Sequence, residues 1–211
     1  MNKLPKDNEV KNENEVIEEA SGAPAPEGEG VGAMKIVREV YDWVEIFVTT
    51  LFVILFVFSF FVRIAYVDGP SMNNTLYDGE TLAVSNLFYT PKRNDIVVFQ
   101  SPDSGLEGGL VKRVIATEGQ TVDIDFETWT VTVDGEVLDE DYVNFVDGVA
   151  MRSYDLSFPI TVPEGCVFVM GDNRNRSNDS RSSQIGCVDT RVIFGHGLFR
   201  VTPFDRFGKV E

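Results

Sequence analysis

Histidine and cysteine are almost absent from this chain, and this scarcity restricts its chemistry. The only histidine is His196, and the only cysteines are Cys166 and Cys187, which form no Cys-x-x-Cys pair. These residues give no cluster of metal ligands, so we expect neither a zinc site nor any other cofactor. His196 stands alone among apolar residues, which favours a structural role. A serine nucleophile would therefore need a base other than histidine.

Basic residues are also few. The chain has 18 Lys and Arg against 34 Asp and Glu, a net charge of -16. Because a protein that binds nucleic acid needs a basic face to displace phosphate counterions, we expect no nucleic-acid partner. Apolar residues make up 43% of the 211 positions, which is enough for a packed core. The length suits one membrane anchor and one domain.

The N-terminal third divides into a polar part and an apolar part. Residues 1–33 are acidic and rich in Pro and Gly, which predicts a disordered, solvated tail. The segment "MKIVREVYDWVE", residues 34–45, has helical apolar spacing, with Tyr41 and Trp43 placed as interfacial anchors. Ile46–Val62 then gives 17 uncharged, mostly apolar residues, and Ile64–Val67 can extend them. We predict an amphipathic lead-in and a transmembrane helix over residues 34–66, with the lipid bilayer as a partner.

Charges near this span indicate its orientation. Lys35 and Arg38 precede it, whereas Arg63 alone follows it closely. Since Lys and Arg are enriched on the cytoplasmic side, we expect a single-pass protein of the plasma membrane with its N-terminus in the cytoplasm. The domain that follows, residues 67–211, would then lie on the outer side.

Beyond residue 67 the signals are those of β structure. Three short runs rich in Val and Ile predict strands, at Asp95–Gln100, Gly109–Thr117 and Cys166–Met170. Asp134-Gly135 stands between two alternating segments, a strong signal for a hairpin with a type I′ turn. No long helical pattern is evident in this part. We predict a mainly β fold, with one N-terminal transmembrane helix, a β-rich domain and a smaller β insertion at about 122–164.

One lysine lies inside a strand that should be buried. Strand alternation puts Lys112 on the same face as Leu110 and Val114. Such a lysine is outward-facing, paired or functional. Taken alone, the outward-facing position is the more common one. Burial in an apolar pocket would instead lower its pKa and make it available as a base.

Two further stretches are candidates for a site. In "VDGPSMNNTL", Val67–Leu76, Ser71 follows a Gly-Pro pair just after the apolar span, and by itself it reads as a turn residue. "GDNRNRSNDSR", Gly171–Arg181, directly follows a predicted strand, and we call it the polar loop. Its Asp, Asn, Arg and Ser residues suit a surface loop. They also suit a fixed polar network that supports a site.

Together, "GPSMNNTL", "KRVIATEG" and the polar loop, in this order after a membrane span, resemble the type I signal peptidases, or leader peptidases. The likeness covers roughly Ser71 to Val201 and the anchor. It implies a membrane-bound serine endopeptidase that removes signal peptides from exported preproteins, cleaving after small residues of the Ala-x-Ala type. The sequence departs from the family pattern at Asn74, where the family has proline. It departs again at Ala116, Glu118 and Gln120.

The resemblance also implies roles for individual residues. Ser71 matches the nucleophile and Lys112, first of the Lys-Arg pair, matches the general base. Ser177 matches the serine whose hydroxyl orients that lysine. Gly69 falls where some members use an oxyanion-hole serine and Gram-positive-type members have glycine. The remaining polar residues that the resemblance places in support of the site are Asp172, Asp179, Arg181 and Arg113.

Two expectations stay less defined. Met72 and Val111 flank the two matched catalytic positions, and we expect them to line the pockets for small substrate residues. Cys166 and Cys187 would lie on the outer side, where a disulfide is permitted, but sequence does not fix their separation.

Two alternatives to the peptidase remain. A module of the same fold could bind exported chains with weakened catalysis, given Asn74. A self-cleaving regulator would share the Ser-Lys β fold, but the chain has a membrane span where such regulators have a DNA-binding helix pair.

Overall fold

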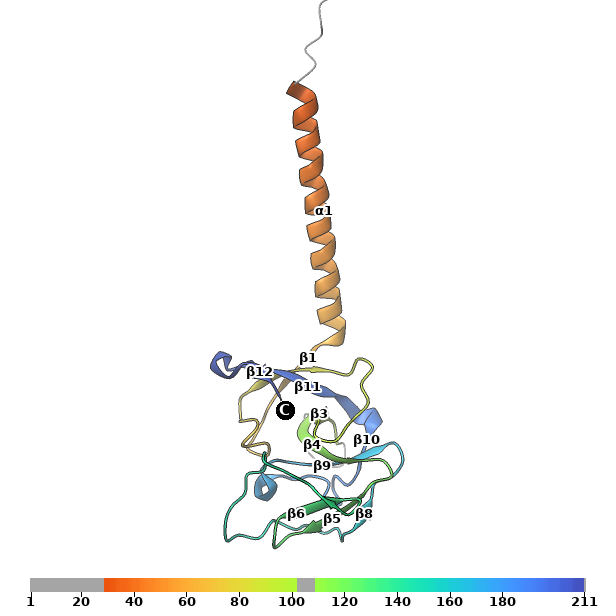
Figure 1. Cartoon of the computed structure of the whole chain (residues 1–211), viewed down its shortest axis with the longest axis vertical. Coiled ribbons are helices and arrows are strands. Elements are labelled where there is room, and N and C mark those ends of the chain that lie inside the picture. Colours follow the sequence, from red (N-terminus) through yellow and green to blue (C-terminus); the bar gives the residue numbers. More distant parts are fainter. Residues whose placement is uncertain (1–28, 102–108, 211) are drawn as a thin grey trace, which may run out of the picture. The chain divides into compact units, whose positions relative to one another are not determined.

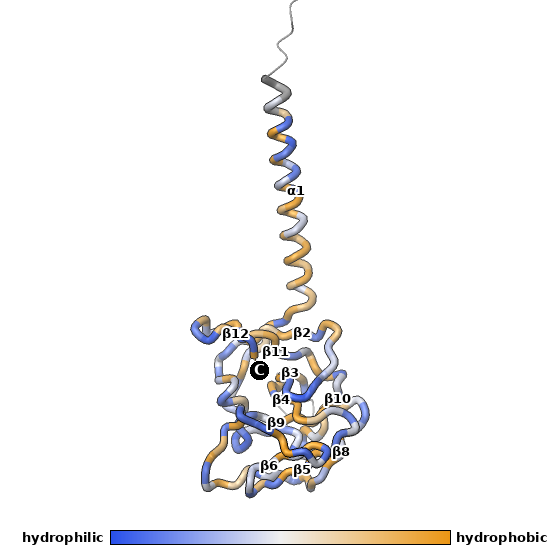
Figure 2. The backbone as a smooth tube through the Cα atoms, in the orientation of Figure 1, coloured by the Kyte–Doolittle hydropathy of each residue, from blue (hydrophilic) through white to orange (hydrophobic). Residues whose placement is uncertain are grey.

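The computed structural model describes residues 29–101 and 109–210. Helix α1 spans Glu29–Phe61. Its segment Met34–Phe61 is 28 residues long and contains an 18-residue apolar window with a mean hydropathy of 2.5, none of which is buried. At 1.5 Å per residue, about 20 residues cross a bilayer core, so length and composition suffice for a span. Figure 2 shows blue and orange mixed in the N-terminal part of α1 and mostly orange in its C-terminal half.

The limits of α1 differ from the sequence prediction at both ends. The helix begins at Glu29, inside the segment assigned to the tail, and residues 1–28 lie outside the described residues. It also ends at Phe61, whereas we expected apolar residues up to Val67 to extend it. Arg63–Tyr66 instead form strand β1, because their backbone pairs with β2 from Arg63↔Val84 to Tyr66↔Thr81.

The main sheet is antiparallel, with strand order β1-β2-β11-β3-β4-β9-β10, and β12 pairs with β11 (Figure 1). Its members are β1 (Arg63–Tyr66), β2 (Thr81–Ser85), β3 (Ile96–Phe99), β4 (Leu110–Thr117), β9 (Cys166–Met170), β10 (Val188–Asp189), β11 (Ile193–Thr202) and β12 (Gly208–Lys209). The three runs rich in Val and Ile form β3, β4 and β9, as predicted, and β4 lies between the other two.

A smaller sheet has the order β7-β6-β5-β8, with β5 (Thr121–Asp125), β6 (Thr130–Val133), β7 (Glu136–Val137) and β8 (Ile160–Thr161). The predicted hairpin is confirmed, since β6 and β7 pair at Val133↔Glu136. Between them, Asp134 has φ 54° and Gly135 has φ 82°. Two consecutive positive φ angles are what a type I′ turn requires.

The hydrophobic core explains why β4 is buried on both faces. Its side chains enter three clusters: Val111 joins the residues around Met72, Val114 packs with apolar residues of β3 and β9, and Ile115 packs between the two sheets. Short 3-10 helices at Arg174–Arg176, Thr190–Val192 and Phe204–Arg206 are the only helical turns among the described residues after α1. The mainly β fold with one long apolar N-terminal helix is therefore confirmed.

Candidate active site

Ser71 lies in a turn that is held at both sides. Just before it, Gly69 adopts φ 83°, and its N–H donates to Asp78 Oδ1 at 2.9 Å. Just after it, Met72 and Leu76 are fully buried in the core, and the Leu76 N–H donates to the Met72 carbonyl at 2.8 Å. The apolar side chains fix the turn in place while the serine hydroxyl remains partly accessible. The Asn73–Asn74 peptide bond in this turn is cis.

Lys112 points at the Ser71 hydroxyl from strand β4. It lies on β4 opposite Val97 of β3, and only 3% of the residue is exposed. Its Nζ lies 3.0 Å from Ser71 Oγ and 2.9 Å from the Val111 carbonyl oxygen. Burial lowers the pKa of Lys112 from 10.5 to about 8, although the nearby carboxylates of Asp179 and Asp172 act in the opposite direction. The lysine therefore supplies a neutral amine near neutral pH far more often than an exposed lysine would.

The polar loop closes over the backbone of the Ser71 turn. The Asn173 N–H donates to the Ser71 carbonyl at 3.0 Å, and Asn173 Nδ2 donates to the Pro70 carbonyl at 3.0 Å. At Gly171 the backbones approach closely. A Cβ there would lie 2.5 Å from the Ser71 carbonyl oxygen and 2.3 Å from Ser177 Oγ. Because Cβ contacts below 3.0 Å essentially never occur, the backbone packing requires glycine at position 171.

Two buried, bidentate ion pairs support the loop. Arg113 donates to Asp172 from Nε at 2.9 Å and from Nη2 at 2.8 Å. Arg181 donates to Asp179 from Nε at 2.7 Å and from Nη2 at 2.9 Å, and the Gly171 N–H adds a bond at 3.0 Å. Burial alone would raise the pKa of Asp179, but the charge and hydrogen bonds of Arg181 hold it below its usual value. Paired guanidinium and carboxylate groups of this kind fix geometry as well as charge.

Ser177 is brought to the site, but without the contact that the resemblance implied. The residue is 1% exposed, and its Oγ has no hydrogen-bond partner within the described part of the chain. It does lie close enough to Asp179 to help lower the pKa of that carboxyl. Its expected role in orienting Lys112 stays a prediction.

A cavity of about 190 Å³ opens beside Ser71, and we call it the serine cavity. Its walls include the apolar residues Pro70, Leu110 and Val111 and the polar residues Asp68, Lys112, Arg176 and Asn178. Val111 thus lies where we expected a pocket-lining residue. Met72 does not line the cavity, because it is fully buried in the core beneath the turn.

The remaining scarce residues lie elsewhere. His196 sits on β11, where its ring stacks on Tyr89 with centroids 4.1 Å apart. Cys166 and Cys187 are both free thiols, and burial raises the pKa of Cys187 to about 11. Across residues 29–101 and 109–210, no group of three or more His, Cys, Asp or Glu side chains could hold a metal ion.

Sequence reasoning missed a second layer of contacts, made by the segment that joins β7 to β8. The Arg113 guanidinium stacks over the Tyr142 ring at 3.9 Å. Glu140 accepts hydrogen bonds from the Tyr142 hydroxyl at 2.8 Å and from the fully buried Arg174 at 2.6 Å. No spacing in the sequence links positions 140 and 142 to the polar loop. The run of acidic and aromatic residues at 139–142, "DEDY", was the only available signal.

Comparison with known proteins finds similarity to one family. The family model described as "Signal peptidase, peptidase S26" matches residues 40–202. The chain is 39% identical over 154 residues to "Probable signal peptidase I-1" of Synechocystis sp., covering 69% of this chain and 74% of that protein. It is 32% identical over 181 residues to "Signal peptidase I" of Bacillus licheniformis, covering 82% and 95%. A solved signal peptidase I from Enterococcus faecalis V583 is 32% identical and covers 51% of this chain and 97% of its own, with a TM-score of 0.43.

Proposed function

The chain belongs to the signal peptidase family, peptidase S26, which removes signal peptides from exported preproteins, and we propose that Ser71 is its nucleophile and Lys112 its general base. The observation that carries this proposal is the 3.0 Å contact between Lys112 Nζ and Ser71 Oγ. A nucleophile and its base must lie within hydrogen-bond reach, and the base must be available unprotonated. The burial that lowers the pKa of Lys112 to about 8 meets the second requirement.

In the proposed mechanism, neutral Lys112 accepts the Ser71 proton as Oγ attacks the carbonyl carbon of the bond to be cut. The resulting ammonium then gives this proton to the leaving amine, so the peptide bond breaks and the signal peptide stays esterified to Ser71. Neutral Lys112 next takes a proton from the water that attacks the ester carbonyl, and the ammonium gives this proton to Ser71 Oγ as the bond between Oγ and the acyl carbon breaks. Each proton that Lys112 accepts is returned within the same half-reaction.

The developing oxyanion needs donors already in position. Gly69 has no side chain to supply a hydroxyl, so we assign the backbone N–H of Ser71 as the main donor. The polar loop fixes that backbone through the bond from Asn173 to the Ser71 carbonyl at 3.0 Å. The pairs Arg113–Asp172 and Arg181–Asp179 hold the loop, and we propose that they act as positioning residues.

The serine cavity suits small side chains. Its volume is about 190 Å³ and Val111 lines it. We propose that it takes the small residues of an Ala-x-Ala segment, with the substrate extended along β4. Met72 supports the cavity indirectly, because its buried side chain fixes the turn that carries Ser71.

We propose the membrane arrangement from charge and exposure. The apolar residues of α1 are exposed along the helix, which favours a lipid environment. Lys35 and Arg38 before the span favour a cytoplasmic N-terminus and place the catalytic domain outside. The division into an N-terminal tail, an anchor within α1 (Glu29–Phe61) and a catalytic domain with an insertion near 122–164 is part of this proposal.

The test is cleavage of a preprotein with an Ala-x-Ala site by the detergent-solubilised full chain. We expect Ser71→Ala and Lys112→Ala to abolish cleavage. Matched controls are Ser157→Ala and Lys92→Ala, which change exposed residues outside the site and should leave the rate unchanged. Full activity of Lys112→Ala would overturn the dyad, and an inactive wild type would favour the alternative of a module that only binds exported chains.

A further inference from the structure

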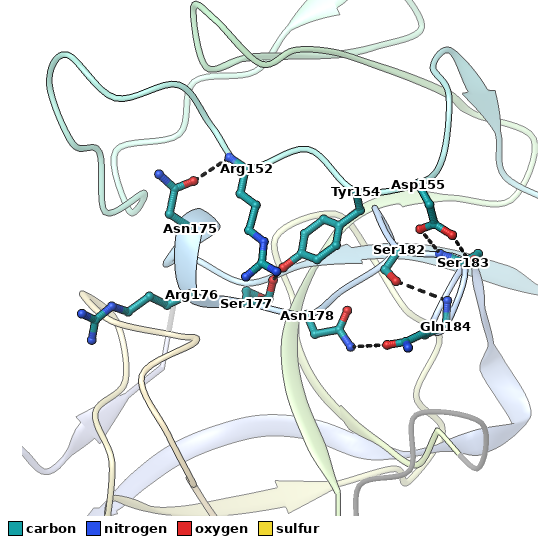
Figure 3. A pocket seen from close by; sticks show the side chains of 10 residues that line it. All are labelled: Arg152, Tyr154, Asp155, Asn175, Arg176, Ser177, Asn178, Ser182, Ser183 and Gln184. Carbon is teal, nitrogen blue, oxygen red and sulfur yellow. Dashed lines mark hydrogen bonds between the residues drawn. The ribbon is translucent and has the colours of Figure 1, made fainter.

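A second, larger cavity lies along the other side of the polar loop. It has a volume of about 650 Å³, and we call it the polar groove. Figure 3 shows Arg152 directed toward Tyr154 and Ser177, Asn178 facing Gln184, and Arg176 extending away from them. The lining is almost entirely polar. It differs in this from the serine cavity, whose walls include the apolar residues Val67, Leu110 and Val111.

The two cavities share a wall. Arg176 and Asn178 line both the polar groove and the serine cavity, and Ser177 stands between them in the sequence. An extended chain bound in the serine cavity beside Ser71 can therefore continue along this shared wall into the polar groove. The polar groove is thus positioned to receive a substrate segment that leaves the serine cavity.

The charge of the polar groove contrasts with that of the whole molecule. The chain carries a net charge of -16. Yet Arg152 and Arg176 both line the groove, both are exposed, and neither forms an ion pair with a carboxylate of the described residues. Asp155 is the one acid in the lining, and the Ser183 N–H and hydroxyl both donate to its carboxylate. The groove therefore offers two positive charges that no carboxylate in the described part of the chain neutralises.

A buried acceptor adds an independent sign of a ligand. Asn178 Nδ2 donates to Gln184 Oε1 at 3.2 Å, but Asn178 Oδ1 is buried without a hydrogen-bond partner among the described residues. A buried polar atom without a partner is costly in a native protein and calls for an explanation. The backbone N–H of an extended peptide is a donor of the kind that this oxygen lacks.

We propose that the polar groove binds the first residues of the mature protein, those that follow the cut bond, and that Arg152 and Arg176 favour an acidic side chain there. This inference rests on the proposed role of Ser71. Arg176, on the shared wall, contacts the substrate residue nearer to the cut bond, and Arg152 contacts a residue further along the mature protein. Asn178 Oδ1 accepts a backbone N–H of the same segment.

The test uses matched peptides that differ only by Glu or Gln. The substitution is placed at each of the first three positions after the bond and, separately, at the middle position of Ala-x-Ala. We expect the Glu peptide to have a roughly three- to fivefold higher kcat/KM than its Gln partner at one or more positions after the bond, mainly through KM. The ratio should fall toward one as salt is raised, because these charges are exposed.

Variants separate recognition from a structural effect. Arg152→Gln and Arg176→Gln should each reduce the Glu/Gln ratio, whereas Arg191→Gln, an exposed arginine outside both cavities, should preserve it. Arg152→Glu should reverse the ratio and favour a Lys peptide at the same position. If the two arginines were merely structural, their substitution would slow cleavage of the Glu and Gln peptides alike and leave the ratio unchanged.

Two results would overturn the inference: equal kcat/KM for Glu and Gln peptides at all three positions after the bond, or a preference confined to the position before it. An unchanged ratio in both arginine variants would overturn the assignment to these side chains. Failure of the wild type to cut even the Gln peptide, or cutting by Ser71→Ala, would instead refute the proposed function.

Discussion

Raising the pH from 6 to 10 is expected to increase kcat/KM along a single limb with an apparent pKa of about 8, set by Lys112. The cause is structural. The residue is 3% exposed on a strand that is buried on both faces, and burial disfavours the ammonium form. Asp179 and Asp172 favour the ammonium and keep the pKa from falling further.

The size of the effect follows from that pKa. With a pKa of about 8, roughly 10% of Lys112 is neutral at pH 7, against about 0.03% for a lysine with a pKa of 10.5. The lowering corresponds to about 3 kcal/mol, which the fold must supply. Below the apparent pKa, kcat/KM is expected to rise about tenfold per pH unit, and above it the value becomes constant.

The assay is the initial rate of peptide cleavage at substrate concentrations well below KM, in buffers of constant ionic strength. His196→Ala is the control, since the only histidine lies away from Ser71 and its loss should leave the limb in place. A limb near 10.5 would show that Lys112 is not desolvated during catalysis. A limb that disappears in His196→Ala would refute the assignment of the base to lysine.

Three further predictions concern the surroundings of the dyad. Lys112→Met should raise the free energy of unfolding at pH 7 by up to about 3 kcal/mol, because the folded variant no longer buries an ammonium group. This difference between variant and wild type should shrink from pH 8 to 10.5, the range in which Lys112 is still protonated in the unfolded chain but neutral in the folded one. Asp172→Asn should lower the free energy of unfolding by about 3 kcal/mol, since Arg113 loses its buried partner, and should move the kinetic limb to lower pH. Gly171→Ala should reduce kcat/KM by at least about tenfold, because its Cβ would displace the Ser71 carbonyl.

These variants have simple controls and clear contrary outcomes. Denaturant unfolding of the detergent-solubilised chain measures the first two, with Lys92→Met as the exposed counterpart of Lys112→Met. A Lys112→Met protein that is less stable than the wild type at pH 7 would mean that the lysine contributes net stability. Gly208→Ala tests glycine replacement where the space is open. Equal activity of Gly171→Ala and Gly208→Ala would contradict the close approach of the loop and the turn.

Local sequence patterns predicted the parts of the fold that local chemistry determines. Runs of Val and Ile gave β3, β4 and β9, and Asp134-Gly135 gave the β6–β7 hairpin, because propensity and turn geometry act over a few residues. The predicted C-terminal end of the membrane helix was wrong for the opposite reason. Ile64–Val67 are apolar enough to extend the span, but pairing of Arg63–Tyr66 with β2 makes this segment strand β1. Strand order and such pairings depend on contacts that no local pattern contains.

The candidate site was predictable to a similar extent. Strand alternation put Lys112 on an apolar face, but the structure buries its neighbour Arg113 on the other face as well. Only the family resemblance connected Ser71 with Lys112, which are 41 positions apart. The contribution of Glu140 could not be predicted, since it reaches Arg174 by a contact between two loops that are 34 positions apart in the sequence.

Identifying the residue that carries the acyl group would test the central claim most directly. The enzyme is mixed with a preprotein-derived peptide, quenched with acid during turnover, digested and mapped by mass spectrometry. We predict that the signal-peptide fragment is esterified to Ser71, and that neither Ser71→Ala nor Lys112→Ala gives this adduct. An acyl group mapped to any other residue, or cleavage retained in Ser71→Ala, would contradict the account.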